Sequence, residues 1–160
     1  MFISAEEAKK KALNAALMLS MSGELEFSQW NSVVIGEPVL VRDLQGNPGY
    51  WLVPIKPSGQ LKGFARITGT GEVAAIGALN GASMVTGLSG KEALERVVST
   101  VPIEEGETLQ EPVFVYDGSP GREAWLIQTK KEGEPQRWIF VTPAFIYERK
   151  AGQLPDMSKE

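Results

Sequence analysis

Apolar and polar residues alternate along this chain with two different periods, and the first of them is helical. Between residues 5 and 20, apolar residues recur every three or four positions, in the set Ala5, Ala8, Ala12, Leu13, Ala16 and Leu17. This spacing is typical of an amphipathic helix. Ser4 and Glu7 have the spacing of a capping box, and Gly23 provides a stop signal. We therefore expect a helix here, with its alanine and leucine face packed on the rest of the chain.

After residue 32 the pattern changes to short apolar runs that are typical of strands. Four such runs, bounded by glycine, proline or asparagine, cover residues 33–42, 50–56, 61–68 and 72–79. Ser89 and Glu92 then repeat the capping signal before a shorter helix that ends ahead of Pro102. Four more runs follow, at residues 112–117, 123–129, 136–142 and 144–149. Because tight turns join successive runs, each set is predicted to be an antiparallel meander.

The two halves of the chain are similar in sequence at an offset of 74 residues. Residues 37–68 and 111–142 share 10 identities over 32 positions without a gap. Such self-similarity indicates an internal duplication. The predicted fold class is therefore α+β, with two tandem helix-plus-antiparallel-meander repeats related by pseudo-twofold symmetry. The first repeat is expected at residues 1–82 and the second at residues 83–150, followed by a polar tail at residues 151–160.

Composition limits the chemistry open to this chain. It has 160 residues, a net charge of -4 and neither cysteine nor histidine. These absences exclude disulfides, thiol nucleophiles, Ser-His triads and zinc sites built from thiolate or imidazole. The acidic charge disfavours a general role on nucleic acid. No stretch is apolar enough to span a bilayer, and Glu6 and Glu7 beside the lysines at 9–11 disfavour a signal peptide. We predict no cofactor, no metal site, no nucleic-acid partner and no membrane insertion.

Two motifs suggest ligand binding or catalysis but have simpler interpretations. Residues 69–74 match the relaxed dinucleotide fingerprint G-x-G-x-x-A. A nucleotide site would need a helix beginning at Glu72, whereas the glycines that follow favour a hairpin turn. Asp43 and Asp117 are carboxylates at matching positions, but each stands before a glycine-containing turn, where aspartate ordinarily caps its own backbone. Both motifs are therefore predicted to be turns.

The remaining candidates are aromatic residues in the predicted strands. Large aromatics in mid-strand are usually core residues, and this interpretation is favoured here. Where such residues reach the surface, they dominate binding hot spots. The candidate partner-binding residues are Tyr50, Trp51, Trp125 and Trp138. An exposed strand edge offers a second mode of binding, by addition of a peptide strand.

Several short segments resemble the PepSY domain family. They are Glu6-Glu7-Ala8 in the first helix, Gly69 to Val73 after a strand and Trp51-Leu52-Val53 in the middle strand, with weaker counterparts at residues 91–94 and 125–127. Pro143 to Ile146 replaces the glycine-glutamate turn in the second half, which weakens the match there. The broader architecture resembles cystatin-like folds. The resemblance implies a non-catalytic module, often outside the cytoplasm and often associated with peptidases as a propeptide or inhibitor-like segment.

We therefore expect a non-enzymatic protein- or peptide-binding module, with peptidase regulation as the role that the resemblance implies. An edge strand or a concave sheet face would engage an extended segment of the partner. The alternative is a small-molecule-binding protein or an enzyme that uses a cavity between helix and sheet. The identity of the partner, the compartment and the oligomeric state are left open by the sequence.

Overall fold

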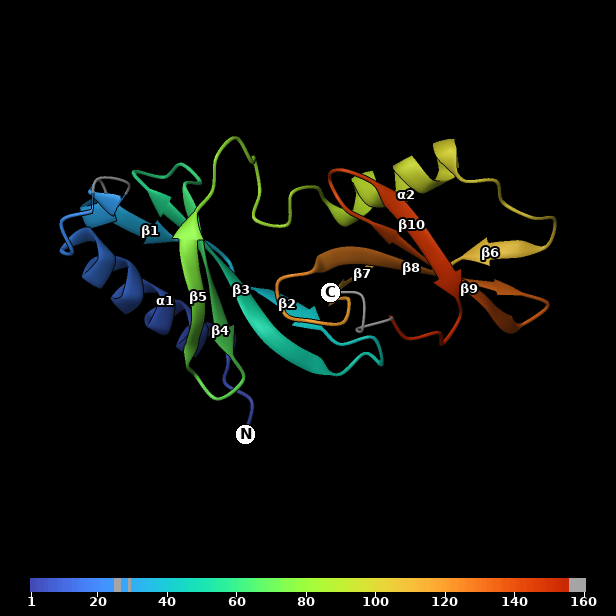
Figure 1. The fold of residues 1–160 in the computed structure, drawn as a ribbon, viewed down its shortest axis with the longest axis horizontal. Coiled ribbons are helices and arrows are strands. Elements are labelled where there is room, and N and C mark those ends of the chain that lie inside the picture. Colours follow the sequence, from blue (N-terminus) through green and yellow to red (C-terminus); the bar gives the residue numbers. More distant parts are fainter. Residues whose placement is uncertain (25–26, 29, 156–160) are drawn as a thin grey trace. The chain divides into compact units, whose positions relative to one another are not determined.

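The computed structural model describes residues 1–24, 27, 28 and 30–155, and residues 156–160 of the predicted polar tail lie outside this part of the chain (Figure 1). In chain order the elements are α1 (Ala5–Ser20), the short 3-10 helix η2 (Trp30–Ser32), β1 (Val33–Ile35), β2 (Val39–Arg42), β3 (Pro48–Pro57), β4 (Gly63–Thr68), β5 (Val73–Ala78), α2 (Gly90–Thr100), β6 (Glu107–Leu109), β7 (Val113–Tyr116), β8 (Glu123–Lys131), β9 (Glu134–Val141) and β10 (Ile146–Lys150).

The strands of the described residues form one ten-stranded mixed sheet, and the predicted fold of two tandem helix-plus-antiparallel-meander repeats with pseudo-twofold symmetry is wrong. The strand order is β10-β9-β8-β7-β2-β3-β4-β5, with β1 paired to β3 and β6 paired to β8. β2 and β7 are parallel neighbours, joined at Arg42 and Val115. The prediction failed because side-chain alternation shows which segments are strands, whereas the choice of strand partner depends on backbone edges that carry no local sequence mark.

The chain divides into two compact units. Unit 1 comprises residues 1–41 and 47–85, and unit 2 comprises residues 42–46 and 86–160. The sequence predicted a boundary between residues 82 and 83 and gave no sign that residues 42–46 would join unit 2. Leu44 ties this segment to unit 2, because its side chain is buried in a cluster with Val115, Ala124, Leu126 and Phe140.

Helix α1 packs on the strands of unit 1 through alanines. Its N-terminus is capped as predicted, since Ser4 Oγ accepts a hydrogen bond from the Glu7 amide at 3.2 Å. The side chains that it buries are Ala8, Ala12 and Ala16. Leu13 and Leu17, expected in the same face, keep 37% and 38% of their surface exposed. Alanines four residues apart let the helix backbone approach the sheet closely, and this places the adjacent leucines at the margin of the contact.

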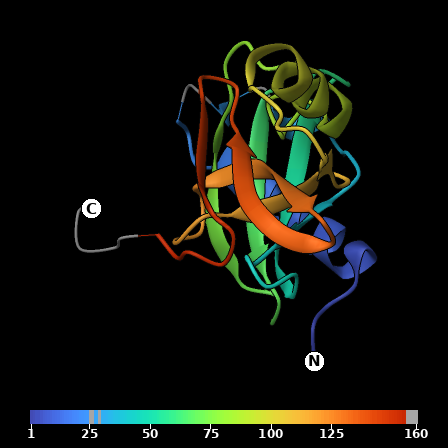
Figure 2. The same ribbon diagram turned by 90° about the vertical axis from the view of Figure 1, so that its right-hand side faces the viewer.

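Helix α2 covers part of the sheet in unit 2, where it lies against β8 and β9 (Figure 2). Ser89 and Glu92 form a complete capping box, because each side chain accepts a hydrogen bond from the backbone amide of the other residue, at 3.0 and 3.1 Å. Ala93 and Val97 are buried against a cluster that includes Ile139. Neither helix of the described chain is long and apolar enough to cross a membrane.

Candidate functional site

Two of the predicted partner-binding residues, Trp51 and Trp125, anchor the starts of the two helices. The indole Nε1 of Trp51 donates a hydrogen bond to the Ile3 carbonyl at 3.0 Å. The indole of Trp125 donates to the Leu88 carbonyl at 2.8 Å. Both accepting residues stand directly before the serine that caps a helix. Both tryptophans are half-buried, and their polar atoms serve the fold itself.

The other two candidates differ in exposure. Tyr50 is buried, with 5% of its surface exposed. Trp138 is half-buried and packs against the cluster that contains Phe140, with the two rings edge to face and their centroids 6.4 Å apart. Tyr50 and Trp51 belong to unit 1, whereas Trp125 and Trp138 belong to unit 2. The role of all four in binding a partner stays a prediction.

Unit 2 contains a buried charged cluster around Asp117, which has no exposed surface. Arg149 binds both carboxylate oxygens, with its Nη1 and Nη2 at 2.8 and 2.6 Å, and the Tyr147 hydroxyl donates to Oδ2 at 2.6 Å. Burial opposes ionisation of Asp117, but the hydrogen bonds from Arg149 and Tyr147 outweigh it and hold its pKa below the usual range. Burial and the Asp117 carboxylate together raise the pKa of Tyr147. The predicted turn-capping role is therefore wrong for Asp117, whose carboxylate is committed to a structural ion pair.

A second buried carboxylate, Glu107, is held in the same manner by Arg137. The Nε and Nη2 atoms of Arg137 donate to the two carboxylate oxygens, both at 2.8 Å, and the side chain of Glu107 is fully buried. These hydrogen bonds outweigh the effect of burial and lower the pKa of Glu107 from 4.5 to about 2. The partners in both clusters are about 30 residues apart in sequence, and no local signal in the sequence marks them as pairs.

The Glu107 pair predicts a specific loss of stability in acid. Because the folded-state pKa lies below the unfolded value, the pair contributes its full stability above about pH 5 and loses it as the pH falls towards 2. We expect Glu107→Gln to be less stable than the wild type at pH 7 and to lose less further stability between pH 5 and pH 2.5. Urea unfolding at both pH values measures this difference. Glu148→Gln is the control, since Glu148 is a half-exposed partner of the same arginine; an equal effect of both changes would contradict the assignment.

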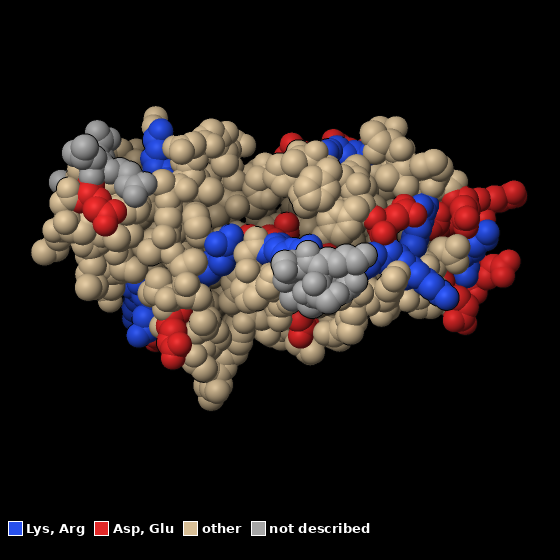
Figure 3. All heavy atoms as spheres, in the orientation of Figure 1, with Lys and Arg blue, Asp and Glu red and all other residues tan. Residues whose placement is uncertain are grey.

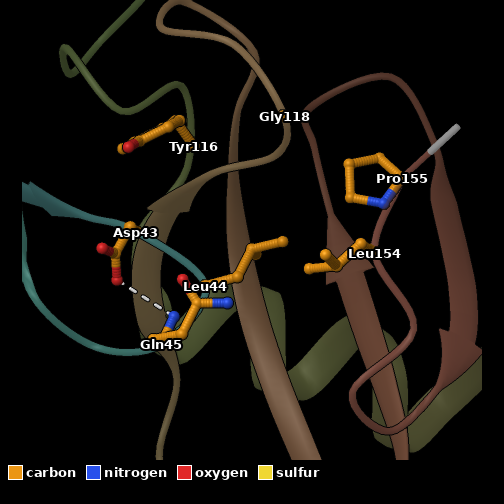
Figure 4. A pocket seen from close by; sticks show the side chains of 7 residues that line it. All are labelled: Asp43, Leu44, Gln45, Tyr116, Gly118, Leu154 and Pro155. Atoms are coloured by element: carbon orange, nitrogen blue, oxygen red, sulfur yellow. Dashed lines mark hydrogen bonds between the residues drawn. The ribbon is translucent and has the colours of Figure 1, made fainter. Parts of the chain in front are cut away.

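A hollow of about 260 Å³ in unit 2 lies beside Asp43 (Figure 4). It is lined by Asp43, Leu44, Gln45, Tyr116, Gly118, Leu154 and Pro155. Asp43 Oδ1 accepts a hydrogen bond from the Gln45 amide at 3.0 Å, which confirms the predicted turn role for this residue. The volume lies just below the range of about 300–1,000 Å³ that small-molecule sites occupy. This hollow therefore favours a small-molecule function only weakly.

Strand β5 of unit 1 lies within residues 72–79, where the sequence predicts a strand. It ends the strand order on one side, as β10 does on the other. The turn before it joins two antiparallel strands, which confirms that residues 69–74 form a hairpin turn and not the start of a helix. All six residues of β5 are uncharged, with the sequence VAAIGA, and Val73, Ala74 and Ala78 are exposed. The surface of this region is mostly uncharged in the space-filling view (Figure 3).

The outer edge of β5 presents backbone groups that β4 does not use. The Leu79 amide donates to the Lys62 carbonyl at 2.8 Å. Hydrogen-bonded pairs alternate with non-hydrogen-bonded pairs along an antiparallel ladder. This alternation turns the N–H and C=O groups of Ile76 and Ala78 away from β4. Among the described residues, β5 is thus an edge strand whose outward backbone donors and acceptors pair with no other strand, and it has no charged side chain to block an added one.

The edge at β10 is protected in the way that sheet edges usually are. Glu148, Arg149 and Lys150 of β10 each pair with a residue of β9. At the offset of 74, these three β9 residues correspond to the β4 residues that pair with Ile76, Gly77 and Ala78 of β5. Charged side chains on an edge strand hinder pairing with another chain. The two halves of the sequence therefore differ in charge at these strands. This difference indicates an open edge only when it is known which strands lie at the edges of the sheet.

Comparisons of the chain with protein-family models, with curated proteins and with solved structures found no significant match. The resemblance to PepSY domains accordingly stays a prediction.

Proposed function

We propose that this chain is a non-enzymatic protein- or peptide-binding module that engages an extended segment of its partner at the edge of β5. The observation that carries the proposal is the combination of outward backbone groups and absent charge on this strand. Strand addition obtains affinity from main-chain hydrogen bonds, which β5 offers at alternate positions. The resemblance to PepSY domains extends the proposal to a peptidase partner, which the module would regulate by steric means.

The ionisable groups support binding over catalysis. A catalytic acid or base is usually poised by a perturbed pKa in an accessible cleft. The carboxylates whose pKa is lowered, Asp117 and Glu107, are buried and each is bound through both oxygens by an arginine. Within the described residues, no cluster of three or more acidic side chains has a geometry that would hold a metal ion. A hollow of about 250 Å³ lined by α1 and β1 residues, which include Leu13 and Ile35, corresponds to the alternative function in a cavity between helix and sheet.

The proposal is tested with peptides selected from a displayed library of random linear sequences. Ala78→Lys places a long charged side chain on the open edge, so we expect it to weaken the selected peptides at least tenfold in titration calorimetry. Ala144→Lys adds the same charge at an exposed alanine in the turn between β9 and β10 of unit 2, and binding should be unchanged. Selected peptides that bind both variants as tightly as the wild type would rule out β5 as the site.

A further inference from the structure

The geometry points to a specificity position on the β5 edge, at Gly77, that receives a large apolar or aromatic side chain from an extended peptide segment of the partner. This inference rests on the proposed function, because it names the chemistry of the segment that adds to β5. It concerns the face of the sheet that carries Phe64 and Gly77, which stand directly opposite each other on β4 and β5.

Gly77 offers a strand beside β5 a place of closest approach. Hydrogen-bonded and non-hydrogen-bonded pairs alternate along β4 and β5. The backbone groups of Ile76 and Ala78 therefore turn outward, and Gly77 and Phe64 form a hydrogen-bonded pair. With its backbone groups directed to β4, Gly77 faces a strand that adds in the antiparallel direction in a non-hydrogen-bonded pair. In such pairs the Cα atoms are only about 4.5 Å apart and the side chains lie closest. The residue that the partner places opposite Gly77 therefore determines the contact on this face.

The ring of Phe64 extends over the space that the glycine leaves. A Cβ atom built on Gly77 would lie 3.2 Å from Cε1 and 3.4 Å from Cζ of this ring. The guanidinium of Arg66 lies over the ring, 4.6 Å from its centroid, and helps to fix its orientation. The partner residue opposite Gly77 thus meets the rim of an aromatic ring, without an intervening side chain from β5. Aromatic side chains are known to cover glycines on sheet edges in this manner.

The second half of the chain fills the corresponding position with its own side chain. Trp138 is 74 residues after Phe64, and its partner on the edge strand is Arg149. That arginine lies over the Phe140 ring, 4.5 Å from the centroid, and binds the Asp117 carboxylate. In unit 1 the same register position is a glycine. The edge strand of unit 2 therefore carries a long charged side chain at this register position, whereas the edge strand of unit 1 carries no side chain there.

The occupant is a peptide segment, because the dimensions of the edge suit a strand better than a second copy of the chain. Six residues form an edge about 20 Å long, the length of an ordinary strand. A stable dimer buries roughly 800 Å² on each partner, and a single six-residue edge is much narrower than such an interface. The segment must also lack proline at the positions that pair with Ile76 and Ala78, since both need a backbone donor on the added strand.

The test uses two capped synthetic peptides, Thr-Val-Thr-Phe-Thr-Val-Thr and the same sequence with alanine in place of phenylalanine. We expect the 160-residue chain to bind the phenylalanine peptide about 2- to 10-fold more tightly, the factor that corresponds to one aromatic pair. Phe64→Leu should remove this preference and leave the affinity for the alanine peptide unchanged. Phe145→Leu, which alters an exposed ring of unit 2, should retain the preference. Ala78→Pro should abolish binding of both peptides, because it removes an outward amide.

The outcomes separate the two proposals. If both peptides bind the wild type with equal affinity and Ala78→Pro abolishes this binding, the inference about Gly77 is overturned and strand addition at β5 is supported. Binding of neither peptide at millimolar concentration, or binding that Ala78→Pro does not alter, would overturn strand addition itself. A wild-type dimer in sedimentation velocity that Ala78→Lys converts to monomer would show that a second copy occupies the edge, and would overturn the assignment to a peptide segment. Circular dichroism and urea unfolding establish that each variant is folded.

Discussion

Asp117→Ala is expected to lower the free energy of unfolding by about 3–5 kcal/mol, the usual cost of removing one partner from a buried ion pair. Asp117 has no exposed surface, and its carboxylate accepts hydrogen bonds from the Arg149 guanidinium and the Tyr147 hydroxyl. Removal of the carboxylate leaves a largely buried arginine without its counter-charge and a hydroxyl without its acceptor. Urea unfolding of the purified protein at pH 7 measures the difference.

Asp43 provides a matched control within the same chain. It occupies the position that corresponds to Asp117 at the offset of 74, but its side chain is only partly buried and accepts a hydrogen bond from the Gln45 amide in a turn. Asp43→Ala should therefore lower the free energy of unfolding by less than Asp117→Ala does, because Asp43 is only partly buried whereas Asp117 has no exposed surface. Equal destabilisation by the two substitutions would contradict the structural difference between these carboxylates. The double variant Asp117→Ala with Arg149→Met should be more stable than Asp117→Ala alone, because it leaves no unpaired charge.

Phe140→Ala is expected to lower the free energy of unfolding by about 3–5 kcal/mol, the range for truncation of a fully buried aromatic residue. Phe140 has no exposed surface, and its ring stacks on Tyr147 at a centroid distance of 4.9 Å with an angle of 7° between the planes. The guanidinium of Arg149 lies over the same ring. The substitution therefore leaves a cavity and loosens the two residues that hold Asp117. Thermal and urea unfolding give the change in stability.

Phe145 is the control for this second substitution. It also contacts the Tyr147 ring, at a centroid distance of 5.7 Å, but 56% of its surface is exposed. Phe145→Ala should change the free energy of unfolding by no more than about 0.5–1 kcal/mol, because a surface truncation leaves little cavity. A large effect at Phe145 together with a small one at Phe140 would show that the apolar core of unit 2 is organised differently.

The functional proposal depends on a contrast between two edges of one sheet. β10 carries three successive charges, one of which belongs to the Asp117 cluster, and so the same residues stabilise unit 2 and protect its edge. β5 consists of small or apolar residues, so it has no charged side chain that could form an ion pair or protect its edge. Exposed, uncharged edge strands are a risk for aggregation unless another segment covers them. A partner strand on β5 would remove that risk, which gives the binding proposal a physical rationale beyond the shape of the surface.

The sequence determined the features that depend on neighbouring residues. Both serine caps, the turn that Asp43 closes and the hairpin turn at residues 69–74 are all present, because each is encoded within a few positions of chain. The offset of 74 residues also identified which strands correspond to one another. Tertiary structure alone decided the alanine face of α1, since the period of the helix admits both alanine and leucine and only close packing distinguishes them.

The single mixed sheet, the pairing of Asp117 with Arg149 and the open edge at β5 likewise followed only from tertiary structure. Each depends on which backbone edges and side chains meet across 30 or more residues, and strand pairing leaves no mark in the alternation of apolar and polar positions. The charges that protect β10 and the glycine that opens β5 were visible from the start in the chain. They bear on function only because the fold places both strands at the ends of the sheet. A backbone group of a strand is left unpaired only where no neighbouring strand is present.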